Sequence, residues 1–280
     1  MKTTFKRVSA FLAAAIFVIA SCTPVETDTD TDNNGLKPDN TEQNGNENTG
    51  NENTGNENTG NENTGGNENT GGNDGELHAS LQGSEYVPIA LDEYSAEAIK
   101  DKVKAAYYVD DTNVFYYIWE GTYNAGTSSG LNFYGEAVTW TSLVVGNVGW
   151  SGAGWCVTNP EYVPAFVSSE DDIANWKLHL AYKGAANVAH CMILYWCGGE
   201  YKFAIGQGTF EDSGVQYPAI APVSGEFQAN AWNEYEISLA DTGFDYSKDN
   251  TASKANILAV LSGGTAGTTF DIDAIFFYKK

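Results

Sequence analysis

The sequence predicts an all-β domain built as an antiparallel two-sheet β-sandwich with at most one short helix. Three observations predict it. The chain from His78 on contains all 7 Trp and is dense in aromatic and β-branched residues. Short apolar runs recur there, separated by Gly-rich and polar segments. This part, about 200 residues long, is large enough for one domain with a sizeable core.

The elements follow from local pattern. The helical pattern covers 95–106, with Ser95 as the N-cap. Loops are expected at 121–130, which is rich in Gly, Ser and Thr, and at 206–229, which contains two prolines. Sharp bends are expected in the Gly- and Trp-rich segment 148–157 and at a hairpin turn of Gly198 and Gly199. The remaining runs predict strands at 86–91, 113–120, 131–134, 139–145, 175–183, 188–197, 201–205, 232–239, 256–261 and 270–278.

Two features of these strands bear on the arrangement. The runs 113–120 and 188–197 are apolar on both faces, so each is either buried twice or keeps one face for a ligand. The closing strand 270–278 is ordered only if it pairs, so we expect it beside an early strand. Regular alternation places Asp271, Asp273, Ile275 and Phe277 on one face, and on the other Phe270, Ile272, Ala274 and Phe276.

The first 22 residues have the pattern of an export signal. Lys2, Lys6 and Arg7 precede an apolar run at 8–20, which ends in Ile-Ala-Ser-Cys at Cys22. This ending resembles a lipobox, in which the signal is cut before Cys22 and its thiol receives lipid. The alternative is an ordinary cleaved signal with a chance cysteine.

Residues 23–77 are of low complexity and include five copies of the sequence NENTG. The repeat has no apolar side chain to bury, so we expect a disordered stalk with a span of roughly 40 Å. A simple-sequence expansion without a role is the alternative. The acidic residues at 26–32 resemble signals that send some lipoproteins to the outer face of the outer membrane. The predicted location is therefore the cell surface, with a lipid anchor in the outer membrane.

The charge of the domain limits its partners. The chain from His78 on holds 24 of the 37 acidic and 10 of the 14 basic residues, a net charge of −14. Such a surface repels nucleic acid and anionic lipid. A neutral ligand fits this surface better than an acidic polysaccharide.

The domain contains three cysteines, an odd number, so at least one thiol is unpaired within the chain. Cys191 and Cys197 are about 20 Å apart if the run is extended, so they do not bridge each other. Cys156 pairs with one of them, or all three are buried thiols. No spacing indicates a zinc site.

The end of the chain resembles a known class of module. The segments WNEYEISL, NILAVLSGG and FDIDAIFFY, within 175–280, resemble jelly-roll carbohydrate-binding modules of the galactose-binding-like type. The lipobox and stalk resemble surface glycan-binding lipoproteins of polysaccharide-utilisation systems. The resemblance implies non-catalytic binding of a neutral glycan, near a glycan transporter complex. It also implies a structural calcium at Asp271 and Asp273, since some members carry one near this position; no other cofactor is expected.

Glycan binding requires flat aromatic faces for sugar rings and polar groups for hydroxyls. Core packing is the alternative for Trp119, Trp150 and Trp155, and we expect Trp176 and Trp232 in the core. The candidate ligand-binding residues are Trp119, Glu120, Tyr123, Asn124, Trp150, Trp155, Trp196, Tyr201 and Tyr217.

Catalysis has less support in the sequence. His78, His179 and His190 lie near no serine nucleophile or metal-type partner in the chain. A carboxylate pattern typical of one jelly-roll hydrolase class is approached only around Glu170 and Asp172, without its final acid. The alternatives to a binding protein are a jelly-roll glycoside hydrolase or lyase, and a structural or adhesive surface lipoprotein.

Overall fold

The computed structural model describes residues 76–146, 150–158, 163–250, 256–263 and 265–280. The export signal, its lipidation site Cys22 and the NENTG stalk up to residue 75 lie outside the described residues, so these remain predictions. Within the described part, no helix is long and apolar enough to cross a membrane.

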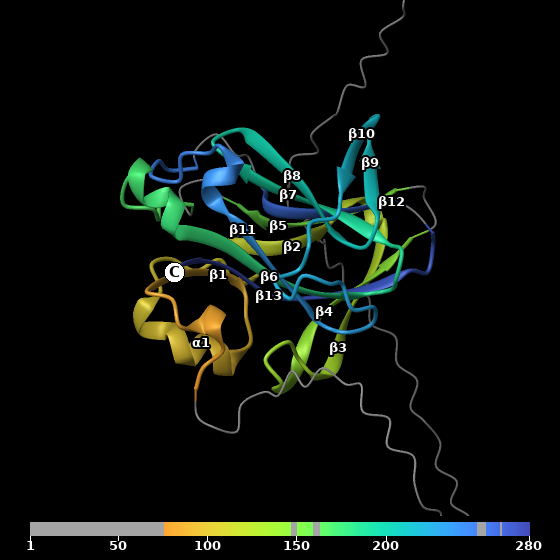
Figure 1. The fold of residues 1–280 in the computed structure, drawn as a ribbon, viewed down its shortest axis with the longest axis horizontal. Helices are drawn as coiled ribbons and strands as arrows, with labels where there is room; N and C mark the ends of the chain where they lie inside the picture. Colours follow the sequence, from red (N-terminus) through yellow and green to blue (C-terminus); the bar gives the residue numbers. More distant parts are fainter. Residues whose placement is uncertain (1–75, 147–149, 159–162, 251–255, 264) are drawn as a thin grey trace, which may run out of the picture. The chain divides into compact units, whose positions relative to one another are not determined.

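Two antiparallel sheets pack face to face, as predicted, and appear as two layers in Figure 1. One short α-helix, α1, covers Glu93–Ile99. Sheet A has the order β11-β6-β13-β4-β3, with β1 also pairing β13, and its strands are β1 (Glu85–Ala90), β3 (Tyr123–Leu131), β4 (Ala137–Val145), β6 (Trp176–Gly184), β11 (Asn233–Ser238) and β13 (Thr269–Lys279). Sheet B has the order β2-β5-β12-β7-β8, built from β2 (Val114–Ile118), β5 (Trp150–Val157), β7 (Ala189–Trp196), β8 (Gly199–Gly206) and β12 (Asn256–Gly263).

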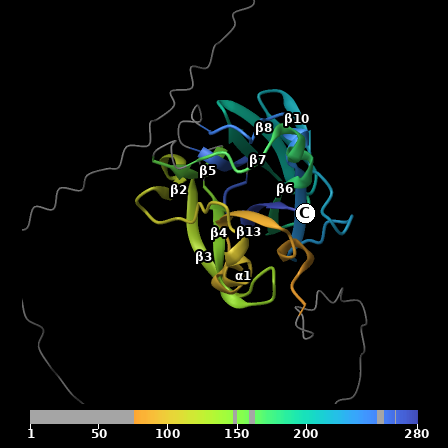
Figure 2. The same cartoon turned by 90° about the vertical axis from the view of Figure 1, so that its left-hand side faces the viewer.

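A separate hairpin and short 3-10 helices complete the fold. The hairpin consists of β9 (Thr209–Asp212) and β10 (Val215–Pro218). In the side view of Figure 2, β10 lies beyond β8, while β2 and β5 lie at the opposite side of the molecule. The 3-10 helices are η1 (Ala79–Leu81), η2 (Lys100–Lys102), η3 (Trp119–Gly121), η5 (Glu170–Asn175) and η6 (Leu239–Thr242).

The closing strand β13 lies at the centre of sheet A. It pairs with β6 and β4 and, near its end, with β1, which confirms the predicted pairing with an early strand. The predicted alternation is wrong beyond Asp273. A β-bulge between Asp273 and Phe276 inserts an extra residue, and Ala274 there has a φ of 51°.

The bulge changes which side chains enter the core. Ile275 and Phe277 follow Phe270 and Ile272 into the space between the sheets. Phe276 and Tyr278 point to the other side of sheet A, where they join a second apolar cluster. This reversal follows because one extra residue moves every later side chain to the opposite face.

The second apolar cluster lies between the outer face of sheet A and the residues that begin the domain. Leu81, Tyr86 and Ile99 pack on the outer face of sheet A, against Phe276 and Tyr278. Figure 1 shows α1 on this side, beneath β1 and β13. The helix begins earlier and ends earlier than predicted, because Asp92, not Ser95, is its cap: Asp92 Oδ1 accepts from the backbone N–H of Tyr94 and of Ser95, each at 3.0 Å.

Three predicted irregular segments are regular strands or contain them. The predicted loop 121–130 forms most of β3, and the predicted strand 131–134 is largely a turn. The segment 148–157 forms β5 without a sharp bend in its described part. The predicted loop 206–229 contains the β9–β10 hairpin. In each case pairing with a neighbouring strand outweighs the weak β-propensity of Gly and Ser.

The cysteines differ in exposure. Cys156 and Cys191 are buried, as expected, whereas Cys197 is exposed. Cys197 lies in the turn between β7 and β8, where its φ of 49° and the φ of 79° at Gly198 suit a two-residue hairpin. No disulfide links the three, so Cys156 does not bridge to either.

Asp172 ties the end of β13 to the rest of the molecule. Its carboxylate accepts hydrogen bonds from Lys279 Nζ at 2.8 Å, Asn175 Nδ2 at 3.0 Å, Ser168 Oγ at 2.9 Å and Trp176 Nε1 at 3.3 Å. The bond from Lys279, foremost, holds the pKa of Asp172 well below its usual range. The ionised form is therefore favoured more in the folded than in the unfolded chain.

This linkage predicts a pH-dependent effect of Asp172→Asn. At pH 7 the variant should lose about 1 kcal/mol of unfolding free energy, less than the roughly 1.5–3 kcal/mol of a charged hydrogen bond because solvent screens the pair. A carboxyl group whose pKa is lowered by folding stabilises the folded chain at pH values above its unfolded pKa, and this stabilisation is lost as the pH falls. The difference in unfolding free energy between the variant and the native chain should therefore shrink below about pH 4. Urea unfolding at pH 7, 4 and 3 measures it. A difference that is constant with pH would contradict the linkage.

Candidate functional site

Aromatic side chains line the outer face of sheet B at one edge. Tyr116 and Ile118 of β2 pack against the core between the sheets. Strand alternation therefore directs Phe115 and Tyr117 outward, on the side where Trp119 packs. All three outward rings are partly exposed. We call Phe115, Tyr117 and Trp119 the aromatic face.

The ring of Trp119 lies against the backbone of the neighbouring strand. A Cβ atom added at Gly152 of β5 would be 2.1 Å from Cε3 of Trp119, and 3.0 Å from Leu261 of β12. Only glycine leaves room for the ring here. The glycines of the Gly-Trp segment thus make space for Trp119 on the outer face, while Trp155 of the same strand points into the core.

Among the described residues, an acid and an amide lie near the aromatic face. Glu120 is exposed and follows Trp119 directly, with a φ of 50°. Asn256 Oδ1 accepts a hydrogen bond from Cys156 Sγ at 2.8 Å beside Gly154. At the opposite edge of sheet B, Lys202 Nζ of β8 is 2.8 Å from Asp212 and 3.5 Å from Glu200. The described groups near the aromatic face are therefore suited to a hydroxyl-bearing ligand.

The structure brings three of the predicted site residues to the outer side of sheet B. Trp119 and Glu120 lie at its β2 edge, and Tyr217 packs on the same apolar cluster from the β9–β10 hairpin. Asn124 is exposed but lies on β3, in sheet A. Trp150 begins β5, and its side chain is outside the described part of the chain.

The other predicted rings are core residues. Tyr123, Trp155 and Trp196 are 3%, 2% and 0% exposed, so no face of these rings is open to a ligand, and their assignment to a binding surface is corrected here. Trp196 Nε1 donates to the carbonyl of Asp245 at 3.1 Å. Tyr201 points inward as well, because it pairs with the core residue Leu194 and packs against the central cluster.

Four outward residues were not among the predicted ligands. Phe115 and Tyr117 share the face of Trp119, and strict alternation along β2 is the signal that identifies them. Tyr195 of β7 points outward while its neighbour Trp196 points inward. Asn256 begins β12, and nothing in its local sequence distinguishes it.

The two acids of β13 have protein partners on the outer face of sheet A. Asp271 Oδ1 accepts from Ser142 Oγ at 2.7 Å, and its Oδ2 is 2.9 Å from Lys183 Nζ. Asp273 Oδ2 accepts from the backbone N–H of Phe133 at 3.1 Å, and burial raises the pKa of Asp273. No group of three or more His, Cys, Asp or Glu side chains suited to a metal occurs among the described residues. The calcium prediction remains untested.

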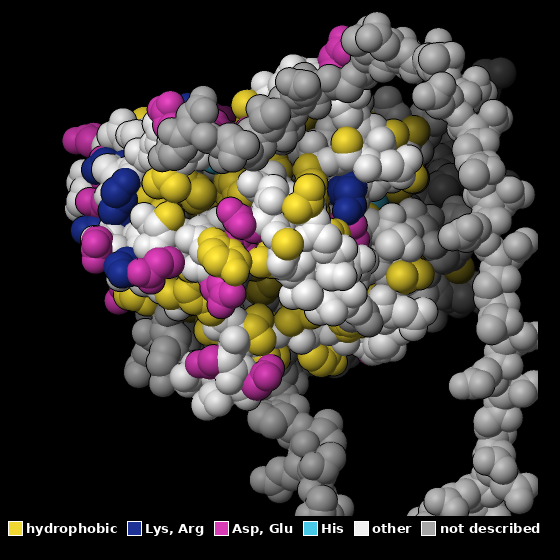
Figure 3. Space-filling model, turned by 90° about the horizontal axis from the view of Figure 1, so that it is seen from below, with side chains coloured by type: hydrophobic (Ala, Val, Ile, Leu, Met, Phe, Trp, Pro, Cys, Tyr) yellow, Lys and Arg dark blue, Asp and Glu magenta, His cyan; other side chains and the backbone are white. Residues whose placement is uncertain are grey.

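A second aromatic group also lies on the outer side of sheet A. Trp232, expected in the core, is only partly buried, and its Nε1 donates to the carbonyl of Leu131 at 3.3 Å. Lys183 Nζ lies 4.4 Å from the ring centroid of Trp140 and 4.6 Å from that of Trp232. Figure 3 views the side of the molecule on which α1 lies, and hydrophobic side chains gather across its middle. Lys183 also pairs with Asp271, so its positive charge is compensated within this group.

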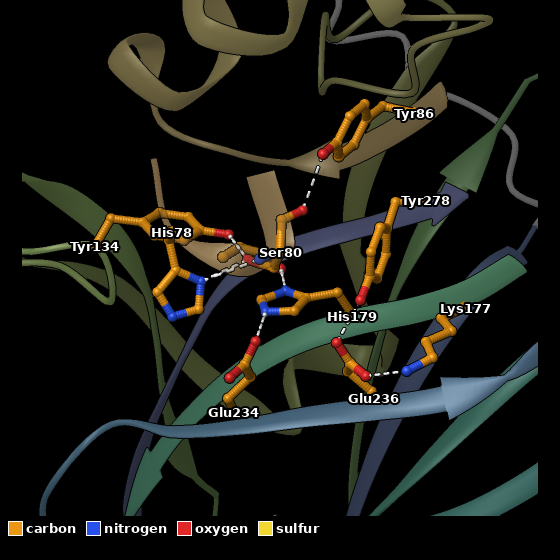
Figure 4. A network of polar contacts seen from close by, with 10 residues as sticks. His78, Ser80, Tyr86, Tyr134, Lys177, His179, Glu234, Glu236 and Tyr278 are labelled. Atoms are coloured by element: carbon orange, nitrogen blue, oxygen red, sulfur yellow. Dashed lines mark hydrogen bonds and ion pairs between the residues drawn. The ribbon is translucent and has the colours of Figure 1, made fainter. Parts of the chain in front are cut away.

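The histidines have partners that the sequence did not indicate. Figure 4 shows His78 Nδ1 2.9 Å from Ser80 Oγ, and His179 Nε2 3.1 Å from Glu234. In the core, His190 Nδ1 is 2.6 Å from Ser262 Oγ. Both serines are 1% exposed, so neither hydroxyl is placed to attack a substrate.

Burial disfavours the charged form of two of the three histidines. Burial lowers the pKa of His190 to about 3, so its imidazole is neutral near pH 7. Burial also lowers the pKa of His78. In Figure 4 Tyr278 and Lys177 both reach Glu236, so these contacts join β6, β11 and β13.

A cavity of about 170 Å³ opens at the end of the sandwich where Trp119 lies. It is smaller than the ~300 Å³ at which pockets for drug-sized ligands begin. The described residues that line it include no Asp, Glu, Lys or Arg; they are Val145, Asn187, Val188, Ala189, His190, Thr265 and Thr268.

The sequence matches no protein-family model and no curated protein. Solved structures similar to the chain include carbohydrate-binding modules. A family 30 module of a cellulosomal cellulase from Clostridium thermocellum has 13% identity and a TM-score of 0.37, over 60% of this chain and 91% of that one. SGBP-B, from a xyloglucan utilisation locus in Bacteroides uniformis, has 14% identity and a TM-score of 0.37, over 61% of this chain and 48% of that one.

An exo-β-agarase is also similar, with 10% identity and a TM-score of 0.35, over 60% of this chain. The chain spans 23% of the length of that agarase. At these identities and TM-scores the likeness is not evidence for a ligand. The fold itself is an all-β, antiparallel two-sheet sandwich with one short α-helix in the part of the chain that the structure describes.

Proposed function

We propose that this protein binds a neutral polysaccharide on the aromatic face of sheet B without cleaving it. The observation that carries the proposal is the position of the Trp119 ring. This ring lies close enough to Gly152 to exclude a Cβ atom, yet remains partly exposed on the same side of β2 as Phe115 and Tyr117. A large aromatic ring fixed on backbone and open to solvent is suited to the apolar face of a sugar ring.

The polar surroundings fit the same ligand. Asn256 and Glu120 offer an amide and a carboxylate for sugar hydroxyls. Lys202, at the opposite edge of sheet B, is already paired with two carboxylates. The domain from His78 on carries a net charge of −14, which would repel an anionic glycan, so a neutral glycan is favoured.

The proposed location follows from the sequence. A lipid on Cys22 would anchor the chain in the outer membrane, and the NENTG stalk would allow the domain to reach glycan beyond the surface. A glycan transporter complex is the proposed partner, because binding without cleavage serves a cell only when uptake or degradation follows.

Affinity gel electrophoresis with neutral polysaccharides tests the proposal. The panel is mixed-linkage β-glucan, xyloglucan, xylan, glucomannan and β-1,4-galactan. We expect retardation by at least one, with no increase in reducing ends after prolonged incubation. Released reducing ends would favour a glycoside hydrolase, and an absence of retardation by all five would favour a structural or adhesive protein.

Gly152→Ala tests the position of the Trp119 ring while leaving Trp119 itself in the chain. The new methyl group would overlap Trp119, so the ring must leave its position. We expect the dissociation constant for the retarding polysaccharide, measured from affinity gels, to rise at least fivefold. Gly126→Ala on β3 is the matched control, because a Cβ there meets nothing within 4 Å. Equal affinities of the two variants would contradict the role of Gly152.

A further inference from the structure

The β9–β10 hairpin, here called the wall hairpin, packs on the outer face of sheet B over β7, β8 and part of β12. Phe210 and Tyr217 are opposite each other in its register, and both pack toward the sheet. Phe210 is only 9% exposed. Its cluster consists of outward residues from β7, β8 and β12, namely Cys191, Ile193, Ala204 and Ala259.

The wall hairpin is tied to the sheet at its base and near its tip. At the base, the backbone N–H of Ile220 donates to the carbonyl of Ala204 of β8 at 2.9 Å, and that of Ala219 donates to the carbonyl of Gly208, also at 2.9 Å, which closes the hairpin itself. Nearer the tip, Asp212 is 2.8 Å from Lys202 Nζ of β8. An apolar anchor, one backbone hydrogen bond to the sheet and an ion pair make it a permanent part of this face rather than a mobile loop.

The aromatic face lies at the other edge of the same sheet. With strands about 4.8 Å apart, β2 to β12 spans only about 10 Å, whereas the whole sheet from β2 to β8 spans about 19 Å. A polysaccharide that crosses the strands from Trp119 meets the wall hairpin after about half of the sheet. The polysaccharide cannot continue beyond the wall hairpin across β7 and β8, because Phe210 occupies the outward surface of these strands.

We propose that the wall hairpin makes this site specific for the end of a glycan chain. The inference rests on the proposed function, since it names which part of the polysaccharide the aromatic face accepts. A terminal sugar unit and its neighbours lie between Trp119 and the wall, and the chain leaves over the β2 edge. An internal segment, which needs space on both sides, is excluded.

The experiment compares ligands of equal mass that differ in their number of chain ends. Mixed-linkage β-glucan, xyloglucan and β-1,4-galactan are each used intact and after partial acid hydrolysis that raises the number of ends about tenfold. Binding to the full chain is measured by isothermal titration. For the polysaccharide that binds, half-saturation should occur at about a tenfold lower mass concentration after hydrolysis.

Equal mass concentrations at half-saturation before and after hydrolysis would overturn the inference and leave the proposed function intact. An absence of binding to all three, in both forms, would contradict the proposed function and with it the inference. A variant in which Asn-Gly replaces residues 209–218 adds an independent readout. If this variant folds, the ratio of the half-saturating mass concentrations of intact and hydrolysed polysaccharide should drop from about ten toward one. An unchanged ratio would show that the wall hairpin does not set the preference for chain ends.

Discussion

Replacing Trp155 by Ala is expected to lower the free energy of unfolding by about 3–5 kcal/mol, the usual cost of truncating a buried Trp. The ring is 2% exposed and lies 4.9 Å, between centroids, from Tyr116 in the space between the sheets. Urea unfolding followed by far-UV circular dichroism measures the change. The large value follows because the sandwich cannot collapse around a cavity lined by two sheets.

Trp232→Ala is the control for this prediction. Its ring is partly exposed on sheet A, so the expected loss of unfolding free energy is about 1 kcal/mol. If Trp155→Ala left stability unchanged and instead abolished glycan retardation, the placement of Trp155 in the core would be wrong.

Trp119→Ala is expected to weaken glycan binding about thirtyfold, or about 2 kcal/mol, as for a central aromatic contact. The ring is the part of the aromatic face that is fixed against Gly152. The dissociation constant for the retarded polysaccharide, from affinity gels, measures the effect. Stability should fall less than in Trp155→Ala, because Trp119 is partly exposed in the native chain.

Trp232→Ala again provides the matched variant, since it removes a partly exposed Trp from the opposite sheet. Its affinity for the polysaccharide should equal that of the native chain. A loss of binding in Trp232→Ala with full binding in Trp119→Ala would move the site to the outer face of sheet A, beside Trp140 and Lys183.

Strands whose two faces differ in composition could be predicted from the sequence. In β6, Trp176, Leu178, Leu180 and Tyr182 alternate with Lys177 and Lys183, and the apolar set lies in the core as expected. Tyr235 and Ile237 of β11 behave in the same way. Here the difference between the two faces is itself the signal, because the wholly apolar face is the one that enters the core between the sheets.

Segments that depend on long-range pairing could not be predicted. The strand β3 has a Gly, Ser and Thr composition typical of a loop, and only its register with β4 makes it a strand. The bulge at Ala274 likewise has no local sequence signal, because Ala rarely adopts a φ of 51°. It is set by the pairing of β13 with β6, and it decides which of Phe276 and Phe277 is in the core.

The candidate site was predicted only in part, for a related reason. Both faces of β2 and of β7 are apolar, so alternation groups Trp119 with Phe115 and Tyr117 but does not say which face is outside. For β7 the second apolar face exists because Phe210 of the wall hairpin covers it. Since that hairpin was read as a loop, Trp196 and Tyr195 could not be assigned to inside and outside in advance.

The most direct test of the proposed binding surface is a map of where glycan touches the domain. Backbone amide chemical shifts of the isotope-labelled full chain would be recorded with and without mixed-linkage β-glucan and xyloglucan oligosaccharides. The account predicts that shift changes concentrate at Phe115, Tyr117, Trp119 and Tyr217, with none at Leu131, Lys183 and Trp232. Shift changes confined to the outer face of sheet A, or none with either oligosaccharide, would contradict it.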